Sequence, residues 1–152
     1  MKIADFTNIN TEYESDHTLV QSGELNGKLY TLKSYKSGSD NHHHIEKINK
    51  EFEILNKLNA EENYLLNVNG NQVLFFPYAD GMSFSKFLRV WEYSTHKFLE
   101  IAIEIGKELL RVHDQNVIHL DLNPSNIIYD TVRNHIKIID FGSAKQYDTK
   151  NV

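Results

Sequence analysis

Two aspartates and one asparagine, each beside an apolar run, are the residues in this chain best suited to chemistry. Asp121 and Asn126 lie between two apolar runs, and Pro124 stiffens the loop that joins them. Asp140 ends a third apolar run and precedes Phe-Gly. Carboxylate and amide oxygens are the ligands that Mg²⁺ prefers, and protein-bound Mg²⁺ is usually shared with substrate phosphates. These three residues therefore predict a metal-dependent phosphate site.

A phosphate site also needs a cation, and Lys33 is the candidate. It lies in an expected strand over residues 28–35, where Leu29, Thr31 and Tyr35 share its face because side chains alternate along a strand. Lysines of this kind more often lie on the surface with only the stem buried. The role of Lys33 therefore depends on the residues around it.

Periodicity and turn signals predict the elements that must position these groups. Asn69-Gly70 is a strong hairpin signal, since both residues tolerate positive φ, and Ser39 or Asp40 could cap the first helix. The expected elements are a strand beginning at 19–20, a strand over 28–35, a helix over about 42–58, strands over 64–68 and 72–76, a short helix from Ser83 to Trp91, a helix over about 95–114, and strands over 117–120, 127–129 and 136–140. This order indicates an α+β fold with a mostly antiparallel N-terminal sheet.

The apolar stripe of the first helix separates two candidate glutamates. Glu51 follows Ile48 by three residues and precedes Leu55 by four, so it flanks the stripe. The neighbours of Glu53 at these spacings are all polar, which predicts that Glu53 faces solvent. The predicted stripe consists of Ile45, Ile48, Phe52, Leu55 and Leu58.

Taken together, His119-x-Asp121-x-x-x-x-Asn126 followed by Asp140-Phe-Gly resembles the catalytic loop and the metal-binding loop of the protein-kinase superfamily. The order of the two motifs, each beside an apolar strand, makes the match specific. The resemblance extends from about Tyr13 to Lys145. The sequence of residues 123–128 resembles that of kinase-like domains found at the start of large bacterial signalling ATPases.

The resemblance implies a fold and a domain organisation. The fold is expected to be protein-kinase-like, with an antiparallel N-lobe sheet plus a helix and a truncated, mainly helical C-lobe. Residues 1–152 are expected to form a single kinase-like domain, with the N-lobe over about 1–77 and a partial C-lobe over about 78–152.

The resemblance also implies a role for each motif residue, with ATP and Mg²⁺ as cofactors. Lys33 would bind the α- and β-phosphates, and Glu51 would hold Lys33 in place. Asp121 would orient the acceptor hydroxyl and take its proton. Asn126 and Asp140 would hold the metal. Catalysis of this kind depends mainly on positioning and charge compensation.

Aromatic residues and histidines complete the set of candidates. Phe75, Phe76 and Tyr78 are expected at a hinge and in the core, and Phe76 and Tyr78 are candidates for an adenine pocket, since such pockets are largely apolar. His119 has the residue type of a general base, but the resemblance implies that it buttresses the loop. The run at 42–44 is three consecutive histidines, which point in different directions on a helix and are predicted to be solvated.

Four departures from the family pattern bear on activity. The stretch over 13–20 lacks the glycines that let backbone N–H groups approach phosphates. Leu120 replaces the arginine that would read a phosphorylated activation loop. Asn123 replaces a lysine two residues after the catalytic aspartate. Ten residues follow Gly142, so the sequence ends before the peptide-docking region of protein kinases, and apolar surface is expected to be uncovered. The chain is therefore expected to be a fragment of a longer chain, a chain completed by a partner or a minimal phosphotransferase.

Composition narrows the remaining classes. The net charge of −5, from 16 basic and 21 acidic residues, argues against nucleic-acid binding. The chain has no cysteine, which excludes disulfides and cysteine metal sites. No signal peptide and no membrane-spanning stretch are expected. These features predict a soluble cytoplasmic domain.

Three functions remain open at this point. The leading prediction is an ATP-dependent phosphotransferase, Ser/Thr protein-kinase-like, that transfers the γ-phosphoryl group of Mg-ATP to a hydroxyl on a protein partner or on itself. The first alternative is a weak or inactive pseudokinase that binds nucleotide or a partner, including a partner that completes the C-lobe. The second alternative is a small-molecule kinase.

Overall fold

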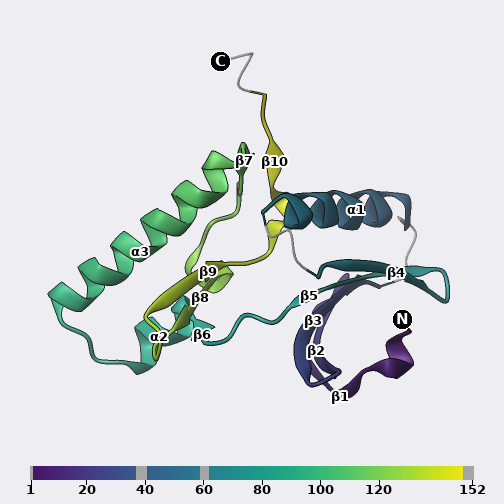
Figure 1. Cartoon of the computed structure of the whole chain (residues 1–152), viewed down its shortest axis with the longest axis horizontal. Helices are drawn as coiled ribbons and strands as arrows, with labels where there is room; N and C mark the ends of the chain where they lie inside the picture. Colours follow the sequence, from purple (N-terminus) through teal and green to yellow (C-terminus); the bar gives the residue numbers. More distant parts are fainter. Residues whose placement is uncertain (1, 37–40, 59–61, 149–152) are drawn as a thin grey trace. The chain divides into compact units, whose positions relative to one another are not determined.

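The computed structural model describes residues 2–36, 41–58 and 62–148 (Figure 1). The proposed caps Ser39 and Asp40 lie outside these residues. The chain divides into two compact units, Met1–Tyr78 and Ala79–Val152, and each is described by itself below.

Unit 1 is a five-stranded antiparallel sheet with one long helix. Its strands are β1 (Thr7–Glu14), β2 (Thr18–Leu25), β3 (Lys28–Tyr35), β4 (Tyr64–Val68) and β5 (Asn71–Pro77), the helix is α1 (Asn41–Leu58), and a 3₁₀ turn, η1 (Ile3–Asp5), precedes them. The order in the sheet is β1-β2-β3-β5-β4, so β3 is the central strand. Figure 1 shows α1 lying along the sheet on the side of β4 and β5.

Two tight turns set the register of this sheet. Asn26 and Gly27 join β2 to β3 with φ angles of 52° and 77°, and Asn69 and Gly70 join β4 to β5 with φ angles of 52° and 84°. Two successive residues with positive φ form the hairpin turn whose twist matches that of the strands. The hairpin predicted at Asn69-Gly70 is therefore present, with its strands in continuous register.

The core of unit 1 lies on one face of β3 and β5. Phe6 stacks on Phe75 with ring centroids 5.0 Å apart, and Tyr30 meets Phe6 edge-on at 6.0 Å. Leu32 and Val73 complete this cluster. Because side chains alternate along a strand, Lys33 and Tyr35 project from the other face of β3.

Strand β1 was not predicted. All eight of its residues are exposed, and its pairing with β2 contains two register shifts. The sequence does carry a signal, because β-branched or aromatic residues alternate with polar ones at Thr7, Ile9, Thr11 and Tyr13. The predicted stripe of α1 was also incomplete: Ile54 is fully buried, whereas Ile45 is 38% exposed.

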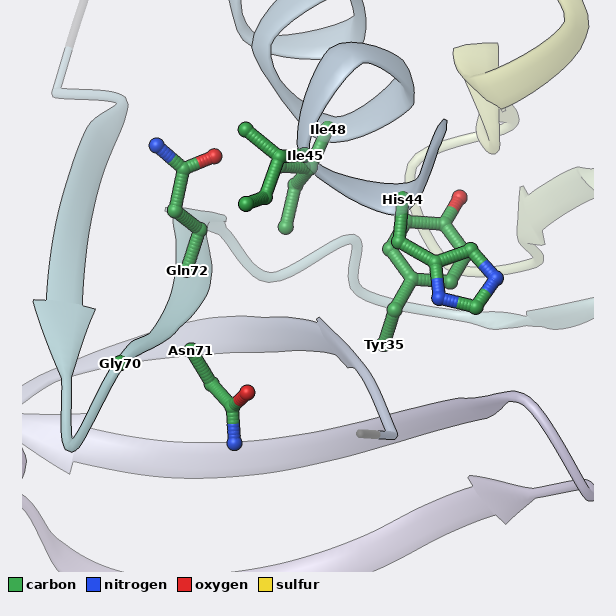
Figure 2. A pocket seen from close by; sticks show the side chains of 7 residues that line it. All are labelled: Tyr35, His44, Ile45, Ile48, Gly70, Asn71 and Gln72. Atoms are coloured by element: carbon green, nitrogen blue, oxygen red, sulfur yellow. The ribbon is translucent and has the colours of Figure 1, made fainter. Parts of the chain in front are cut away.

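A small hollow lies at the N-terminal end of α1, and Figure 2 shows the seven residues that line it. His44 stacks on Tyr35, with ring centroids 5.0 Å apart. The prediction that this histidine is solvated is therefore wrong. The cavity holds about 20 Å³, which is the room of about one water molecule. It does not accommodate a nucleotide. Its lining consists of Tyr35, His44, Ile45, Ile48, Gly70, Asn71 and Gln72.

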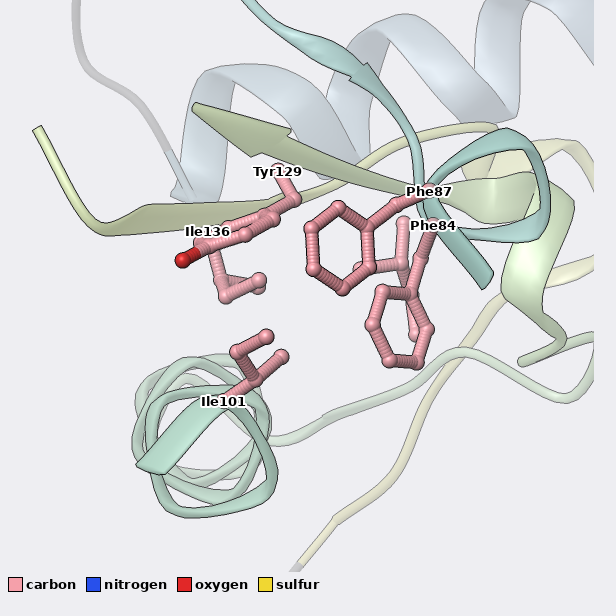
Figure 3. Packing of buried hydrophobic residues seen from close by; sticks show 6 residues of the cluster. Phe84, Phe87, Ile101, Tyr129 and Ile136 are labelled. Carbon is pink, nitrogen blue, oxygen red and sulfur yellow. The ribbon is translucent and has the colours of Figure 1, made fainter. Parts of the chain in front are cut away.

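Unit 2 combines two helices with short strands. Its elements are β6 (Met82–Ser83), α2 (Phe84–Val90), α3 (Thr95–Asp114), β7 (Val117–Ile118), η2 (Pro124–Asn126), β8 (Ile127–Asp130), β9 (His135–Ile138), η3 (Phe141–Ser143) and β10 (Lys145–Gln146). Strands β6, β8 and β9 form one antiparallel sheet, and β7 pairs with β10. Figure 3 shows the core between α2, α3 and the β8–β9 hairpin.

Serine caps fix the starts of both helices in unit 2. Ser83 Oγ accepts a hydrogen bond from the Lys86 N–H at 3.2 Å, and Ser94 Oγ accepts one from the Lys97 N–H at 3.1 Å. The predicted helix over 95–114 is confirmed, as is the helix that Ser83 caps. The α+β class with an antiparallel N-terminal sheet is confirmed. Among the described residues, no helix combines the length and apolar character needed to cross a membrane.

Candidate active site

Lys33 and Glu51 meet inside unit 1. The Lys33 Nζ lies 3.0 Å from Glu51 Oε1 and 2.9 Å from Oε2. Lys33 is 6% exposed and Glu51 is 1% exposed, whereas Glu53 lies on the exposed side of the helix. Removing two charges from water is costly unless they pair closely, so each of these side chains depends on the other.

The sheet and α1 together hold this ion pair. Lys33 sits on the central strand, opposite Val20 of β2 and Leu74 of β5, so hydrogen-bonded strands on both sides fix its backbone. Glu51 projects from α1 between the buried residues Ile48 and Leu55, as its spacing predicts. The lysine ammonium is therefore held at a fixed point.

The turn that precedes β2 is closed by a serine and not by glycines. Ser15 Oγ accepts hydrogen bonds from the N–H groups of His17 (3.4 Å) and Thr18 (3.1 Å), and the Ser15 N–H donates to the Thr18 carbonyl at 2.9 Å. No residue from 13 to 20 has positive φ. These N–H groups already have partners within the turn, so the turn is a poor phosphate cradle.

Phe76 and Tyr78 lie at the end of β5. Phe76 is opposite Thr31 of β3 and is half-buried. The Tyr78 N–H donates to the Leu29 carbonyl at 3.1 Å, which extends the sheet by one hydrogen bond. Phe75 is fully buried in the core, so Phe76 and Tyr78 are the aromatics of this segment with accessible surface.

The loop that carries Asp121 is tied together by amide side chains. Asn126 Nδ2 donates to the Asp121 carbonyl at 2.9 Å and to its Oδ2 at 3.3 Å. Asn123 Nδ2 donates to the same carbonyl at 3.0 Å, and Asn123 Oδ1 accepts from the Ser125 N–H at 2.9 Å. The predicted pair Asp121 and Asn126 is thus in direct contact, and the Asp121 carboxylate is exposed.

The structural role of Asn123 was missed in the sequence, where it was read as the replacement of a lysine. It caps the 3₁₀ turn η2, which begins at Pro124. An asparagine directly before proline and serine is a turn-initiating signal, and that signal could have identified it.

A backbone hydrogen bond links the segment that carries Asp140 to Asn126. The Ile139 N–H donates to the Asn126 carbonyl at 2.9 Å. Asp140 itself has φ 61°, and its Oδ1 accepts from the Gly142 N–H at 3.3 Å. Non-glycine residues with positive φ are uncommon and often occur at functional sites. The exposed carboxylate of Asp140 is therefore fixed in direction.

His119 connects the Asp121 loop to the Asp140 segment. Its Nδ1 accepts from the Asp121 N–H at 3.3 Å, and its Nε2 lies 2.9 Å from the Ile139 carbonyl, to which it must donate. The ring is 1% exposed and meets Phe141 edge-on at 4.9 Å. Both nitrogens are occupied, so His119 positions the loops.

The structure thus groups the predicted residues in two sets. Lys33 and Glu51 meet in unit 1, where Phe76 and Tyr78 also lie. The second set, Asp121, Asn126 and Asp140, is gathered in unit 2. Within the described parts of the chain, no group of three or more histidine, aspartate or glutamate side chains is arranged to hold a metal, and this includes the histidines at 42–44.

A model of the protein kinase domain matches residues 19–152, which is most of the chain. The chain belongs to the protein kinase family. The match begins after β1 and includes every residue of both sets. Membership in this family explains the order of the two sets along the chain. Lys33 and Glu51 come first, on a strand and a helix, and Asp121, Asn126 and Asp140 follow in loops.

Individual members of the family show the same similarity. The chain is 29% identical to the cAMP-dependent protein kinase catalytic subunit of Dictyostelium discoideum over 145 residues, which cover 82% of this chain and 22% of that protein. It is 28% identical to the probable serine/threonine-protein kinase fnkE of the same organism over 140 residues, or 84% of this chain and 11% of that protein. It is 31% identical to the human cell division cycle 7-related protein kinase over 88 residues, or 57% of this chain and 15% of that protein. The chain therefore spans about a fifth or less of the length of these relatives.

Proposed function

We propose that this protein is an ATP-dependent phosphotransferase that transfers the γ-phosphoryl group of Mg-ATP to a Ser/Thr hydroxyl of a protein. The relatives named as serine/threonine or protein kinases support the reaction class and the kind of acceptor. We also propose that residues 1–152 act as one catalytic domain, with lobes over about 1–77 and 78–152.

The buried pair of Lys33 and Glu51 carries this proposal. Lys33 lies on the central strand and is only 6% exposed. Burying a charged side chain costs stability, which favours a functional use of its charge. Held by two carboxylate oxygens, its ammonium has a fixed position and can bind the α- and β-phosphates of ATP without reorganisation. Phe76 and Tyr78 supply apolar surface for the adenine.

The residues of unit 2 fit a magnesium ion. Asp140 offers a carboxylate whose direction is fixed by the Gly142 N–H. The Asn126 side chain makes its hydrogen bonds to Asp121 through its nitrogen, which orients its oxygen for a cation. Carboxylate and amide oxygens are the donors that Mg²⁺ selects. When bound, the ion would neutralise charge on the phosphates during transfer.

Asp121 is the proposed base and orienting group for the acceptor hydroxyl. Its carboxylate is exposed, and the Asn126 amide bonds one of its oxygens. Its backbone is fixed on both sides, because its N–H donates to His119 Nδ1 and its carbonyl accepts from the side-chain amides of Asn123 and Asn126. A carboxylate on a fixed loop can receive a proton from a hydroxyl brought within hydrogen-bonding distance.

Transfer of phosphate from labelled ATP to a mixture of protein substrates, and to the chain itself, tests this function. We expect Asp121→Asn and Asp140→Asn to lower the rate by about 100-fold or more. Asp114→Asn, which changes an exposed aspartate at the end of α3, is the matched control and should retain full activity. Equal rates in all four proteins would refute the proposal.

A catalytically weak nucleotide-binding module is the second candidate, and the turn at 15–18 favours it. The N–H groups of this turn are used within the turn, so they contribute little to holding phosphates. Exposed Leu120 and capping Asn123 stand where a protein kinase would place cationic side chains. Nucleotide binding without turnover would favour this candidate over the first.

A further inference from the structure

An exposed apolar stripe runs along α3, on the side opposite its packed face. Ile101 and Val112 are fully buried, and Figure 3 shows Ile101 pointing into the aromatic cluster. Leu99, Ile103 and Leu110 lie on the other side and are 55%, 58% and 61% exposed. On a helix of 3.6 residues per turn these three positions fall within about 40° of one another. Such a stripe is the pattern of a helix that packs against another helix.

Gly106 lies in the middle of this stripe. A Cβ placed there would meet no atom within 4 Å, so the glycine leaves a gap between Ile103 and Leu110. Glycine inside a helix costs about 1 kcal/mol relative to alanine. The spacing of Leu99, Ile103, Gly106 and Leu110 is four, three and four, which is the same in both directions along the helix.

We propose that this stripe is a self-association surface, on which the α3 helices of two copies of this chain pack in antiparallel orientation. A two-fold axis between Ile103 and Gly106 would bring Leu99 of each copy against Leu110 of the other. It would also seat each Ile103 in the gap over the other copy's Gly106. A two-fold interface requires a self-complementary surface, and large-against-small pairing of this kind is how helices interdigitate.

Charges on one flank of the stripe favour the antiparallel orientation. In this register Glu100 of one copy lies across from Lys107 of the other, and His96 lies across from Asp114. The opposite-charge pair of Glu100 and Lys107 occurs twice by symmetry. Within one chain Lys107, whose side chain is exposed, pairs with half-buried Glu104 at 2.7 Å, and Glu100 pairs with Lys97 at 3.4 Å. Ion pairs near the surface contribute little, so exchanging partners between copies costs little.

A parallel arrangement lacks this complementarity. It would place the charged flank of one helix against the opposite flank of the other, which carries Ala102 and Leu109. Glu100 and Lys107 would then have no partner across the interface. The stripe spans the 12 residues from Leu99 to Leu110, whose ends lie about 17 Å apart along the helix axis. A single helix pair of this length is a small interface, so the dimer should be weak and dependent on concentration.

Sedimentation equilibrium of the 152-residue chain over about 5–500 µM tests the surface, a range chosen for small interfaces. We expect a reversible monomer–dimer equilibrium that Ile103→Glu shifts at least tenfold toward monomer. Val132→Glu is the matched control, because Val132 is 92% exposed in the β8–β9 turn and lies off the stripe. A monomer at all concentrations, or equal effects of both variants, would overturn the proposal.

Charge exchange tests the register. Glu100→Lys or Lys107→Glu alone should weaken the dimer, because each places like charges across the interface. The double variant restores both pairs in an antiparallel dimer and should return the dissociation constant to near that of the wild type. Helix content measured by circular dichroism controls for changes within one chain. Failure of the double variant to recover would contradict this register.

Disulfide trapping tests the orientation, and the chain suits it because it has no cysteine. Leu99→Cys and Leu110→Cys, mixed and oxidised, should form the mixed disulfide, since the two residues are opposite each other only in antiparallel helices. Each variant alone should cross-link poorly, because a disulfide requires Cα atoms within about 7 Å. Preferential cross-linking of Leu99→Cys to itself would indicate parallel helices and overturn the proposal.

Discussion

Lys33 and Glu51 form a two-point ion pair inside unit 1, with the lysine nitrogen 3.0 Å and 2.9 Å from the two carboxylate oxygens. The two residues are 18 positions apart, and a strand and a helix bring them together. Because the pair is buried, removing either partner should destabilise the protein, since the remaining charge would be desolvated without compensation.

Glu51→Gln is therefore expected to destabilise the protein by about 3 kcal/mol, since it leaves the Lys33 charge buried without its counter-charge. Glu53→Gln, two residues away on the exposed side of α1, should change the free energy of unfolding by less than about 0.5 kcal/mol. Urea unfolding followed by circular dichroism measures both. A double variant, Lys33→Met with Glu51→Leu, should recover most of the stability while lacking any phosphate-binding charge. Equal effects of the two glutamine variants would contradict the account of this pair.

His119→Phe is expected to slow phosphoryl transfer without changing its pH profile. The phenyl ring keeps the edge-on contact with Phe141, but the hydrogen bonds to Asp121 and Ile139 are lost, at about 2 kcal/mol of stability. We expect the rate to fall about tenfold, because the loop that carries Asp121 is less well positioned. Rates measured from pH 6 to 8 check this. Loss of a pH-dependent limb of this profile would show instead that His119 transfers a proton.

Asp130 should make stability depend on pH in the acid range. Hydrogen bonds from the Arg133 backbone and side chain, and from the Val132 N–H, hold the pKa of this carboxyl below its usual value. A lowered pKa in the folded state means that the stabilisation is present above the unfolded value of about 3.9 and is lost as the pH falls through the folded pKa.

Asp130→Asn is accordingly expected to melt at a lower temperature than the wild type at pH 7, and the two melting temperatures should converge as the pH is lowered below about 4. Thermal melts across this range measure the difference. A difference in melting temperature that stayed constant from pH 7 to pH 3 would show that the Asp130 charge contributes nothing.

Gly81→Ala should be among the most destabilising single changes in unit 2. Gly81 has φ 125°, and an added Cβ would lie 2.5 Å from the Tyr129 carbonyl oxygen. We expect a loss of about 2–4 kcal/mol from backbone strain and this clash. Gly70→Ala is the matched control, since Gly70 also has positive φ but an added Cβ would meet nothing within 4 Å, and it should cost about 1 kcal/mol. Similar losses of stability at the two sites would contradict the prediction, because they would mean that the close contact with the Tyr129 carbonyl adds no cost.

Local signals predicted the long helices of this protein well. Helical periodicity predicted α1 and α3, and Ser83 predicted the start of the short helix α2. Ser83 and Ser94 each accept the hydrogen bond that serine favours at a helix start. The choice of Glu51 over Glu53 followed from helical geometry alone. The burial of each glutamate agrees with it.

Features that depend on distant partners were harder to predict. Strand β1 is exposed along its whole length, so it lacks the apolar face that usually reveals a strand. Strands β6 and β10 are two residues long and exist because β8 and β7 pair with them. The stacking of His44 on Tyr35 likewise depends on how a helix meets a sheet, which spacing along one element does not encode.

The central proposal is that the ammonium of Lys33 binds the phosphates of ATP and that the carboxylate of Asp140 binds Mg²⁺. The most direct measurement is the melting temperature of the chain with and without millimolar ATP, each with and without Mg²⁺. Lys33→Ala and Asp140→Asn are compared with the control Lys28→Ala, which changes an exposed lysine on the same strand.

A ligand that binds only the folded state raises stability by mass action, and at 100 times the dissociation constant the rise should be about 5–10 °C. The account predicts such a shift, dependent on Mg²⁺, in the wild type and in Lys28→Ala. It predicts no shift in Lys33→Ala and no Mg²⁺ dependence in Asp140→Asn. The absence of any shift in the wild type at millimolar Mg-ATP would contradict the claim.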